Sequence, residues 1–374
     1  MCYIGGYDTP GFSWRVFIAG NYTFVADGDS GLRIVDVTNP FSPAEVGCYR
    51  TQGSAEDVFV DGVYAFVANF SAGLRIVDIS DPQNPQEIGF YDTPGFTRNV
   101  YVLGSYAYVA DDGAGLRILD ISNPSDPHEV GFYNPSGWIK AVHVVGNYAY
   151  VARGGDGFSV VDVSNPTNPH EVGHCNLPGY AGYVRVYGTY AYVVDGDLRI
   201  IDVSDPTDPH VVGTYDSDYA TCVAVDGHYA YISAYTSGFR IIDVTDPYNP
   251  REVGYYNTPD YAWGISANGE YIYVADGNAG LEIYRNLLIG IEEEFKVVAD
   301  DIRVINLKDG ILFKITGPHR SAMLKIYNPT GRLVKEVMVF RNFIFSPDKD
   351  GVYFYKLEVG KKICTVNSSQ FVDL

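Results

Sequence analysis

The 374-residue chain is 46% apolar and 14% aromatic, so it is long enough for more than one domain and too apolar for a disordered protein. Its formal net charge of −20 is uneven, because residues 1–286 hold 13 Lys and Arg against 35 Asp and Glu, whereas residues 287–374 hold 13 against 11. An acidic body repels a phosphate backbone, which argues against nucleic acid as a partner. No run approaches the roughly 18 apolar residues of a membrane span.

The first predicted element is a strand at Ile4–Asp8, in a short N-terminal stretch without the basic and apolar regions of a signal peptide. The chain is therefore either cytosolic or already processed. Ile4–Asp8 matches the pattern of Glu87–Asp92, which is a fourth strand in the repeat described next. We therefore expect strand 4–8 to pair with Leu281–Arg285 and close the last blade.

A repeat of about 42 residues then fills the chain as far as Asn286. The segment Gly31-Leu-Arg-Ile-Val-Asp36 recurs six more times, and a second element, Tyr22 to Asp27, recurs with it. In the second unit, four β-type runs span Asp57–Val60, Tyr64–Ala68, Leu74–Ile79 and Glu87–Tyr91, separated by turn sequences such as Asp61-Gly62. Seven four-stranded units whose strands are apolar on both faces predict a seven-bladed β-propeller over residues 1–286.

The repeat also resembles a known family. Leu74-Arg-Ile-Val-Asp-Ile-Ser-Asp-Pro82, followed by Pro85-Gln-Glu-Ile-Gly89, is similar to the LVIVD-repeat β-propellers over about three quarters of the chain. The resemblance implies an extracellular or envelope protein and no particular reaction.

After a predicted linker at residues 287–299, residues 300–374 have a different β pattern. Seven candidate strands favour a small immunoglobulin-like sandwich; they are Ile302–Leu307, Gly310–Ile315, Met323–Tyr327, Leu333–Val339, Asn342–Phe345, Gly351–Val359 and Lys361–Val366. The segments Leu324–Val334 and Gly351–Lys356 resemble the C-terminal sorting domains of type IX secretion, which implies export to the cell surface. The usual short basic ending is absent, and Asn367–Leu374 stands in its place.

Identically filled positions of the repeat are expected to be structural. Five arginines recur three residues before an aspartate, and because a buried acid needs a partner, they predict a structural Arg/Asp network. Its members are Arg33 with Asp36, Arg75 with Asp78, Arg117 with Asp120, Arg199 with Asp202 and Arg240 with Asp243; Ser159 and Glu282 replace the arginine in the other two blades.

Acidic turns follow the second strand, as in Asp27-Gly-Asp29, Asp111-Asp-Gly113 and Asp195-Gly-Asp197. Asp-Gly is hairpin chemistry, so we interpret them as turns, and calcium is the alternative that the sequence leaves open. The five cysteines show no paired spacing and no histidine cluster, so the sequence predicts no other metal or cofactor.

Positions that vary between blades are free to serve a function. One such position enters the innermost strand, and an aromatic position precedes it by two residues. Because both lie in loops at the channel mouth, we expect a binding face or, alternatively, an aromatic plug of the channel. The candidate binding residues are Phe12, Trp14, Phe96, Arg98, Trp138, Lys140, Tyr180, Tyr219, Tyr261 and Trp263.

No catalytic residues are predicted, because no Ser-His-Asp set, HExxH motif or glycine-rich phosphate loop occurs. The sequence favours a secreted or surface-exposed, non-enzymatic protein that binds a protein or glycan. The alternatives are a subunit that self-associates into an extracellular polymer by strand pairing, and an enzyme acting on polysaccharide through acids at the channel mouth.

Overall fold

A computed structural model describes residues 2–286 continuously, together with the backbone of seven later strands between residues 302 and 367. The chain divides into two compact units, one of which, Tyr3–Tyr284, is the propeller. The predicted linker, residues 287–299, lies outside the described residues. No helix long and apolar enough to cross a membrane occurs among the residues that the structure describes.

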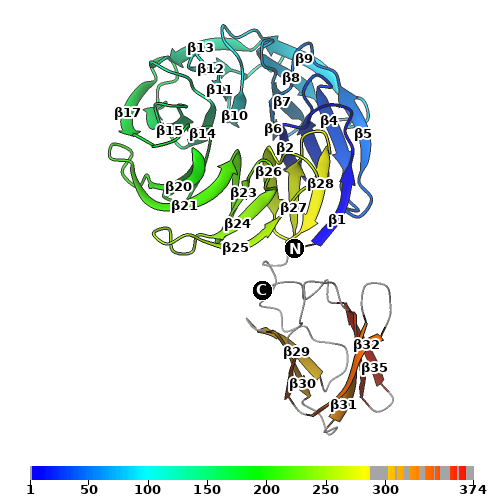
Figure 1. Ribbon diagram of the computed structural model, residues 1–374. Helices are drawn as coiled ribbons and strands as arrows, with labels where there is room; N and C mark the ends of the chain where they lie inside the picture. The colour runs from blue at the N-terminus through cyan, green and yellow to red at the C-terminus, as the bar shows by residue number, and fades with distance from the viewer. Residues whose placement is uncertain are drawn as a thin grey trace. The chain divides into compact units, whose positions relative to one another are not determined.

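Seven four-stranded antiparallel sheets surround a central channel (Figure 1), which confirms the predicted seven-bladed propeller. Each blade runs from an innermost to an outermost strand. The strands of blades one to four are β2 (Arg15–Ala19), β3 (Tyr22–Ala26), β4 (Leu32–Asp36) and β5 (Ala44–Tyr49); β6 (Asp57–Asp61), β7 (Tyr64–Ala68), β8 (Leu74–Asp78) and β9 (Gln86–Tyr91); β10 (Asn99–Leu103), β11 (Tyr106–Ala110), β12 (Leu116–Asp120) and β13 (His128–Tyr133); β14 (Ala141–Val145), β15 (Tyr148–Ala152), β16 (Phe158–Asp162) and β17 (His170–Cys175). Those of blades five to seven are β18 (Tyr183–Tyr187), β19 (Tyr190–Val194), β20 (Gly196–Asp202) and β21 (His210–Ala220); β22 (Cys222–Asp226), β23 (Tyr229–Ser233), β24 (Phe239–Asp243) and β25 (Arg251–Tyr256); β26 (Gly264–Asn268), β27 (Tyr271–Ala275) and β28 (Leu281–Arg285).

The N-terminal strand β1 (Cys2–Tyr7) completes the seventh sheet, whose order is β1-β28-β27-β26. This is the position that its sequence predicts. Gly5 of β1 also approaches blade one, because a Cβ there would lie 2.4 Å from the carbonyl oxygen of Pro40. The first and last blades are thus joined by both backbone pairing and close packing.

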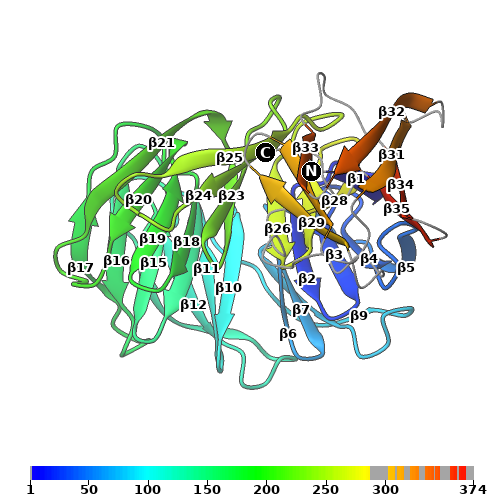
Figure 2. The ribbon, with the colours of Figure 1, turned by 90° about the horizontal axis from the view of Figure 1, so that it is seen from below.

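Clusters of buried apolar side chains lie between successive blades rather than within one. Between blades one and two, Phe24 and Ile34 meet Val58 and Val67, all 3% exposed or less. The middle strands are therefore buried on both faces, which explains why they lack the alternation of a half-exposed sheet. Figure 2 shows the blades side by side, edge-on.

The prediction that five repeated arginines pair with the strand-end aspartates is wrong, because the arginines have other partners. These arginines are Arg33, Arg75, Arg117, Arg199 and Arg240. Residues three apart in a strand point to opposite faces of the sheet. Arg33 instead lies 3.6 Å from Asp27 and 3.5 Å from Glu45, and Arg117 likewise reaches Asp111 and Glu129.

The strand-end aspartates instead accept hydrogen bonds from the turn that follows each strand. Asp36 accepts a hydrogen bond from the Thr38 amide at 2.8 Å, and the side chain of Thr38, together with this amide, lowers the pKa of Asp36. The same bond to the amide two residues on recurs at Asp78, Asp120, Asp202 and Asp243.

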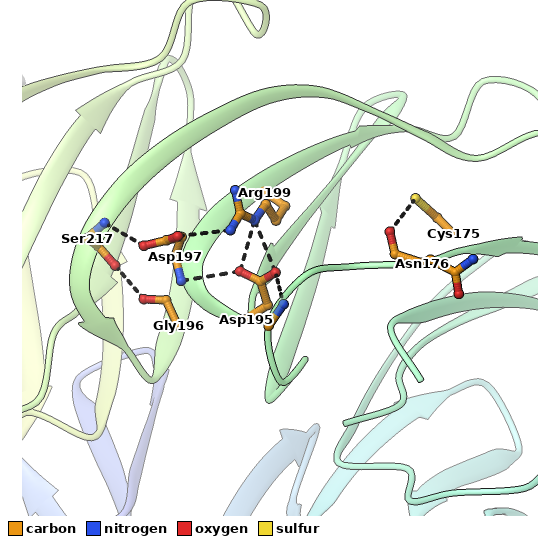
Figure 3. A network of polar contacts seen from close by, with 8 residues as sticks. Cys175, Asn176, Asp195, Gly196, Asp197, Arg199 and Ser217 are labelled. Atoms are coloured by element: carbon orange, nitrogen blue, oxygen red, sulfur yellow. Dashed lines mark hydrogen bonds and ion pairs between the residues drawn. The ribbon is translucent and has the colours of Figure 1, made fainter. Parts of the chain in front are cut away.

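Blade five shows the corrected network most fully (Figure 3). Arg199 donates to Asp195 at 2.9 Å and to Asp197 at 2.9 Å, and Asp197 accepts from the Ser217 amide. Arg33 and Arg117 thus join an acid of the second-strand turn to one of the outer strand, and Arg199 pairs with two acids of its turn rather than with Asp202, which ends its strand.

Seven strands follow in the second unit: β29 (Ile302–Leu307), β30 (Gly310–Ile315), β31 (Ser321–Tyr327), β32 (Leu333–Phe340), β33 (Asn342–Phe345), β34 (Phe354–Val359) and β35 (Lys362–Asn367). They form a three-stranded sheet, β29-β30-β33, and a four-stranded sheet, β32-β31-β34-β35. The immunoglobulin-like assignment of residues 300–374 stays a prediction.

Candidate binding face

The loops that enter the innermost strands lie beside the turns that follow the second strands of the preceding blades. The amides and carbonyls of Gly28 and Ala55 pair at 2.9 and 3.1 Å across the first two blades. Equivalent bridges join the other neighbours: Phe70 to Thr97, Asp112 to Ile139, Gly154 to Ala181, Gly196 to Ala220, Tyr235 to Ala262 and Gly277 to Ser13. We call this side of the ring the loop face; nine of the ten candidate residues lie in its loops, and Tyr219 lies near the end of the long strand β21.

Five of the ten candidates, with Phe70, form what we call the basic aromatic patch, on blades two to five. Phe96 stacks on Phe70 at 4.5 Å, and the Arg98 guanidinium lies 4.6 Å from the Phe70 ring. Lys140 lies 4.6 Å from the Trp138 ring and 5.7 Å from that of Tyr180. Trp138 is 55% exposed, and Phe96 and Tyr180 are about as open, so large apolar surface faces solvent beside two cations.

Ion pairs hold the two cations of this patch in place. Asp112, buried beneath it, lies 3.2 Å from Arg98 and 3.0 Å from Lys140. Glu56 lies 3.2 Å from Arg98, and burial raises the pKa of Glu56. The cations are therefore positioned before any partner arrives, which lowers the entropic cost of recognition.

The other five candidates, with Tyr235, form a second group around the closure of the ring, which we call the tryptophan cluster. Trp14 lies 4.8 Å from Trp263 and 4.7 Å from Phe12, and these three rings are half-buried. Tyr235 stacks on Tyr261 at 4.5 Å and contacts Trp263 and Tyr219.

Beneath the tryptophan cluster, Arg15 donates to the carbonyl oxygens of Trp263 and Trp14, at 2.7 and 3.0 Å. The rings of Trp14 and Trp263 are half-buried, whereas those of the basic aromatic patch face solvent, and both the plug and the binding interpretation stay predictions.

Phe70 and Tyr235 are the residues of the loop face that the sequence reasoning missed. They occupy the slot that is Gly28, Gly154, Gly196 and Gly277 in four blades, and their φ angles of 39° and 47° are strained for aromatic residues. The aligned repeats contain a signal for these residues. An aromatic residue stands where four other blades have glycine, and nothing in blade packing requires an aromatic side chain there.

The acids of the second-strand turns have structural partners. Asp27 accepts from the Thr9 and Ser13 hydroxyls and the Gly11 amide, at 2.5 to 3.0 Å, and burial raises its pKa. Asp111 is bound in the same way by Thr93, Gly95 and Thr97. Within residues 2–286, no group of three or more His, Cys, Asp or Glu is placed to hold a metal.

The central channel contains a cavity of about 390 Å³, lined by the innermost strands. It extends from Arg15, below the tryptophan cluster, to the exposed residues Gly20 and Asn268 at the opposite end of the channel. A row of rings covers part of its wall, with successive centroid distances of 5.0, 4.8 and 4.5 Å from Phe17 through Phe59 and Tyr101 to His143.

The profile of the LVIVD repeat matches seven consecutive segments of the chain, at residues 10–51, 52–93, 94–135, 136–177, 178–217, 218–258 and 259–283. The chain belongs to the LVIVD-repeat family. The matched segments coincide with the blades, each running from one loop of the loop face to the next. No curated protein sequence matches the chain significantly.

Solved structures resemble this LVIVD-repeat protein in fold. The β-propeller domain of Cps50 (Swd1) from Myceliophteria thermophila is 13% identical with a TM-score of 0.63, covering 76% of this chain and 99% of its own. U3-55K is 10% identical with a TM-score of 0.63, covering 76% and 98%. The computationally designed protein Ika8 is 8% identical with a TM-score of 0.56, covering 98% of both chains. At these identities the likeness shows the fold alone.

Proposed function

We propose that this LVIVD-repeat protein is a secreted or cell-surface binding protein, without enzymatic activity, that recognises a protein or glycan through the basic aromatic patch. The single observation that carries the proposal is the exposure of Phe96, Trp138 and Tyr180 beside Arg98 and Lys140. Exposed aromatic rings with fixed cations are the composition of binding hot spots.

The chemistry of the patch suits two kinds of partner. An exposed indole offers a flat face to a sugar ring or an apolar side chain, and Lys140 beside it would attract a carboxylate or sulfate. Asp112 and Glu56 balance the charges of Arg98 and Lys140, but the remainder of the propeller is strongly acidic, so an acidic partner is repelled least at this patch.

The extracellular location is supported by the resemblance of residues 300–374 to sorting domains of type IX secretion. A fusion of residues 287–374 to a periplasmic reporter, expressed in a bacterium with that system, tests it. Reporter at the cell surface supports the location, and reporter retained in the periplasm contradicts sorting by this domain.

Binding is tested by arrays of glycans and of extracellular proteins, followed by affinity measurement for each hit. Trp138→Ala and Lys140→Ala should each weaken binding by roughly tenfold or more. Tyr248→Ala is the matched control, because Tyr248 is 60% exposed and lies in an outer turn between β24 and β25.

Equal binding by Trp138→Ala and the wild type would contradict the proposed patch. Loss of polysaccharide viscosity on incubation with the protein would favour the enzymatic alternative, and ordered fibres in negative-stain images would favour the polymer.

A further inference from the structure

The channel wall varies between blades as much as the loop face does. At one depth of the ring, the seven innermost strands present side chains of different chemistry, in the order Phe17, Phe59, Tyr101, His143, Arg185, Ala224 and Ser266. A side chain that served only to pack the blades would not need to differ from one blade to the next. One side of the channel is aromatic at this depth, and the next part of the wall carries an imidazole and a guanidinium.

Arg185 is a cation without an anion. It lines the cavity, and among the residues that the structure describes it forms no hydrogen bond or salt bridge. Arg15, the other arginine that lines this cavity, donates to three backbone carbonyl groups. Arg185 is partly exposed to the channel, so its guanidinium is free to exchange water for an anion that enters the channel.

His143 is a second incompletely satisfied group beside Arg185. It is 5% exposed, and its Nδ1 has no hydrogen-bond partner within residues 2–286. Burial and the charge of Arg185 lower the pKa of His143 well below its ordinary value, so the imidazole is neutral at pH 7. A neutral imidazole offers one donor and one acceptor.

The charge of the cavity has the opposite sign to that of the domain. Its charged lining residues are Arg15, Arg185 and Asp57. Asp57 already accepts hydrogen bonds from the Asn99 side chain at 2.5 Å and the Val100 amide at 3.2 Å. With Asp57 ionised, the channel therefore carries one excess positive charge, in a propeller with 35 acidic residues against 13 basic ones.

We propose that the channel binds a small organic monoanion, a carboxylate with a flat apolar body, whose carboxylate pairs with Arg185 and whose body lies against Phe59 and Tyr101. A planar guanidinium matches a carboxylate with two parallel hydrogen bonds. The rings of Phe17, Phe59 and Tyr101 form a continuous apolar wall next to it. A volume of about 390 Å³ lies within the range of small-molecule sites.

This site is separate from the basic aromatic patch. The cavity ends at Arg15 beneath the tryptophan cluster and reaches the surface at Gly20 and Asn268, which end the hairpins on the other side of the ring. The ligand would enter from that side, so a partner on the loop face and a ligand in the channel can be bound together.

Calorimetric titration of the full chain with benzoate, phenylacetate and hexanoate tests the proposal, with benzamide as the uncharged counterpart of benzoate. We expect at least one of the three carboxylates to bind with a Kd below about 1 mM and benzamide to bind far more weakly. Arg185→Gln should weaken carboxylate binding roughly 10- to 100-fold, because it removes a charged hydrogen bond.

Two further variants control for folding and for general charge. Arg185→Lys should keep part of the affinity, since an ammonium retains the charge but loses the paired geometry. Arg251→Gln should bind as the wild type does, because Arg251 is exposed on the outer strand β25, paired with Asp243. Absence of binding by all three carboxylates, equal binding of benzamide, or unchanged binding by either Arg185 variant would overturn the proposal.

Discussion

Glu282 shows how one residue departs from the pattern of its repeat. Five other blades place an arginine there, and three of these arginines lie near the acid of the second-strand turn; in blade seven a carboxyl group stands next to Asp276 instead. Glu282 is 7% exposed and Asp276 is fully buried. Burial first, and then the charge of Asp276, raise the pKa of Glu282 to about 7.

This elevated pKa predicts a pH dependence of stability. Between about pH 4.5 and pH 7 the folded chain holds a proton that the unfolded chain has released, so stability falls as the pH rises through this window. Glu282→Gln should therefore raise the free energy of unfolding at pH 8 by about 2 to 3 kcal/mol and flatten its change between pH 5 and pH 8. Urea unfolding at several pH values measures this.

The matched control for Glu282 is Glu129→Gln, in which the acid faces Arg117 rather than another acid. It should give no gain in stability. A Glu282→Gln variant with the pH profile of the wild type would contradict the elevated pKa.

The corrected arginine partners predict which aspartates matter for folding. Asp111→Ala leaves the buried Thr97 hydroxyl, the partly buried Thr93 hydroxyl and the Gly95 amide without their acceptor, so it should cost roughly 2 to 4 kcal/mol. Asp120→Ala removes one bond to the Ser122 amide at a strand end and should cost about 1 kcal/mol or less. Equal costs in chemical denaturation, or a larger cost at Asp120, would restore the original pairing with Arg117.

At the scale of the element, a glycine in six of the seven outer strands meets a proline turn of the next blade. A Cβ on Gly131 would lie 2.1 Å from the carbonyl oxygen of Pro166, and the same approach recurs between Gly89 and Pro124. The outer strand has a register shift nearby, between Ile118 and Leu119 on its partner. The repeated Glu-Val-Gly and Asn-Pro or Asp-Pro segments are thus the two halves of one contact between blades.

Gly131→Ala should therefore destabilise the propeller by roughly 2 to 4 kcal/mol, since backbone atoms of two blades must move apart. Gly155→Ala is the matched control, because a Cβ at Gly155 meets nothing within 4 Å. Thermal unfolding of the two variants compares them. A Gly131→Ala variant as stable as Gly155→Ala would mean that the blades do not approach so closely.

Strand β1 contributes the same contact at the closure of the ring, through Gly5 and Pro40. Tyr7 of β1 also donates to Glu45 of blade one at 3.2 Å. Deletion of residues 1–8 exposes an edge of β28 and removes these links, so it should lower the melting temperature of the whole propeller. Unchanged melting would contradict closure by β1.

At the scale of the whole molecule, the sequence predicts the features that recur in every blade, but not the contacts between side chains that are distant in the sequence. Blade number, strand order and the place of β1 follow from periodicity, because turn residues and apolar runs act locally. The partners of Arg33 and the exposed state of Trp138 depend on side chains brought together from distant positions. Arg185 and His143 escaped notice because only the ring places them side by side in the channel.

Variation around the ring still identified the loop face, and the structure divides it into two parts. Trp14 and Trp263, whose rings are half-buried, accept hydrogen bonds from Arg15 through their backbone carbonyl groups, whereas Phe96, Trp138 and Tyr180 face solvent. The same criterion, variation between blades, also leads to the channel wall. It applies there to the positions one and three residues after Trp14 and its equivalents in the other blades. Both proposed sites thus lie where the repeat is not constrained by blade packing.

One variant tests this central claim most directly, in which Phe96, Trp138, Tyr180 and Tyr219 are all replaced by Ser. These side chains are 46 to 65% exposed, so we predict that the melting temperature changes by no more than a few degrees while binding to the partner found on the arrays is lost. A large fall in melting temperature, or binding equal to that of the wild type, would contradict the claim.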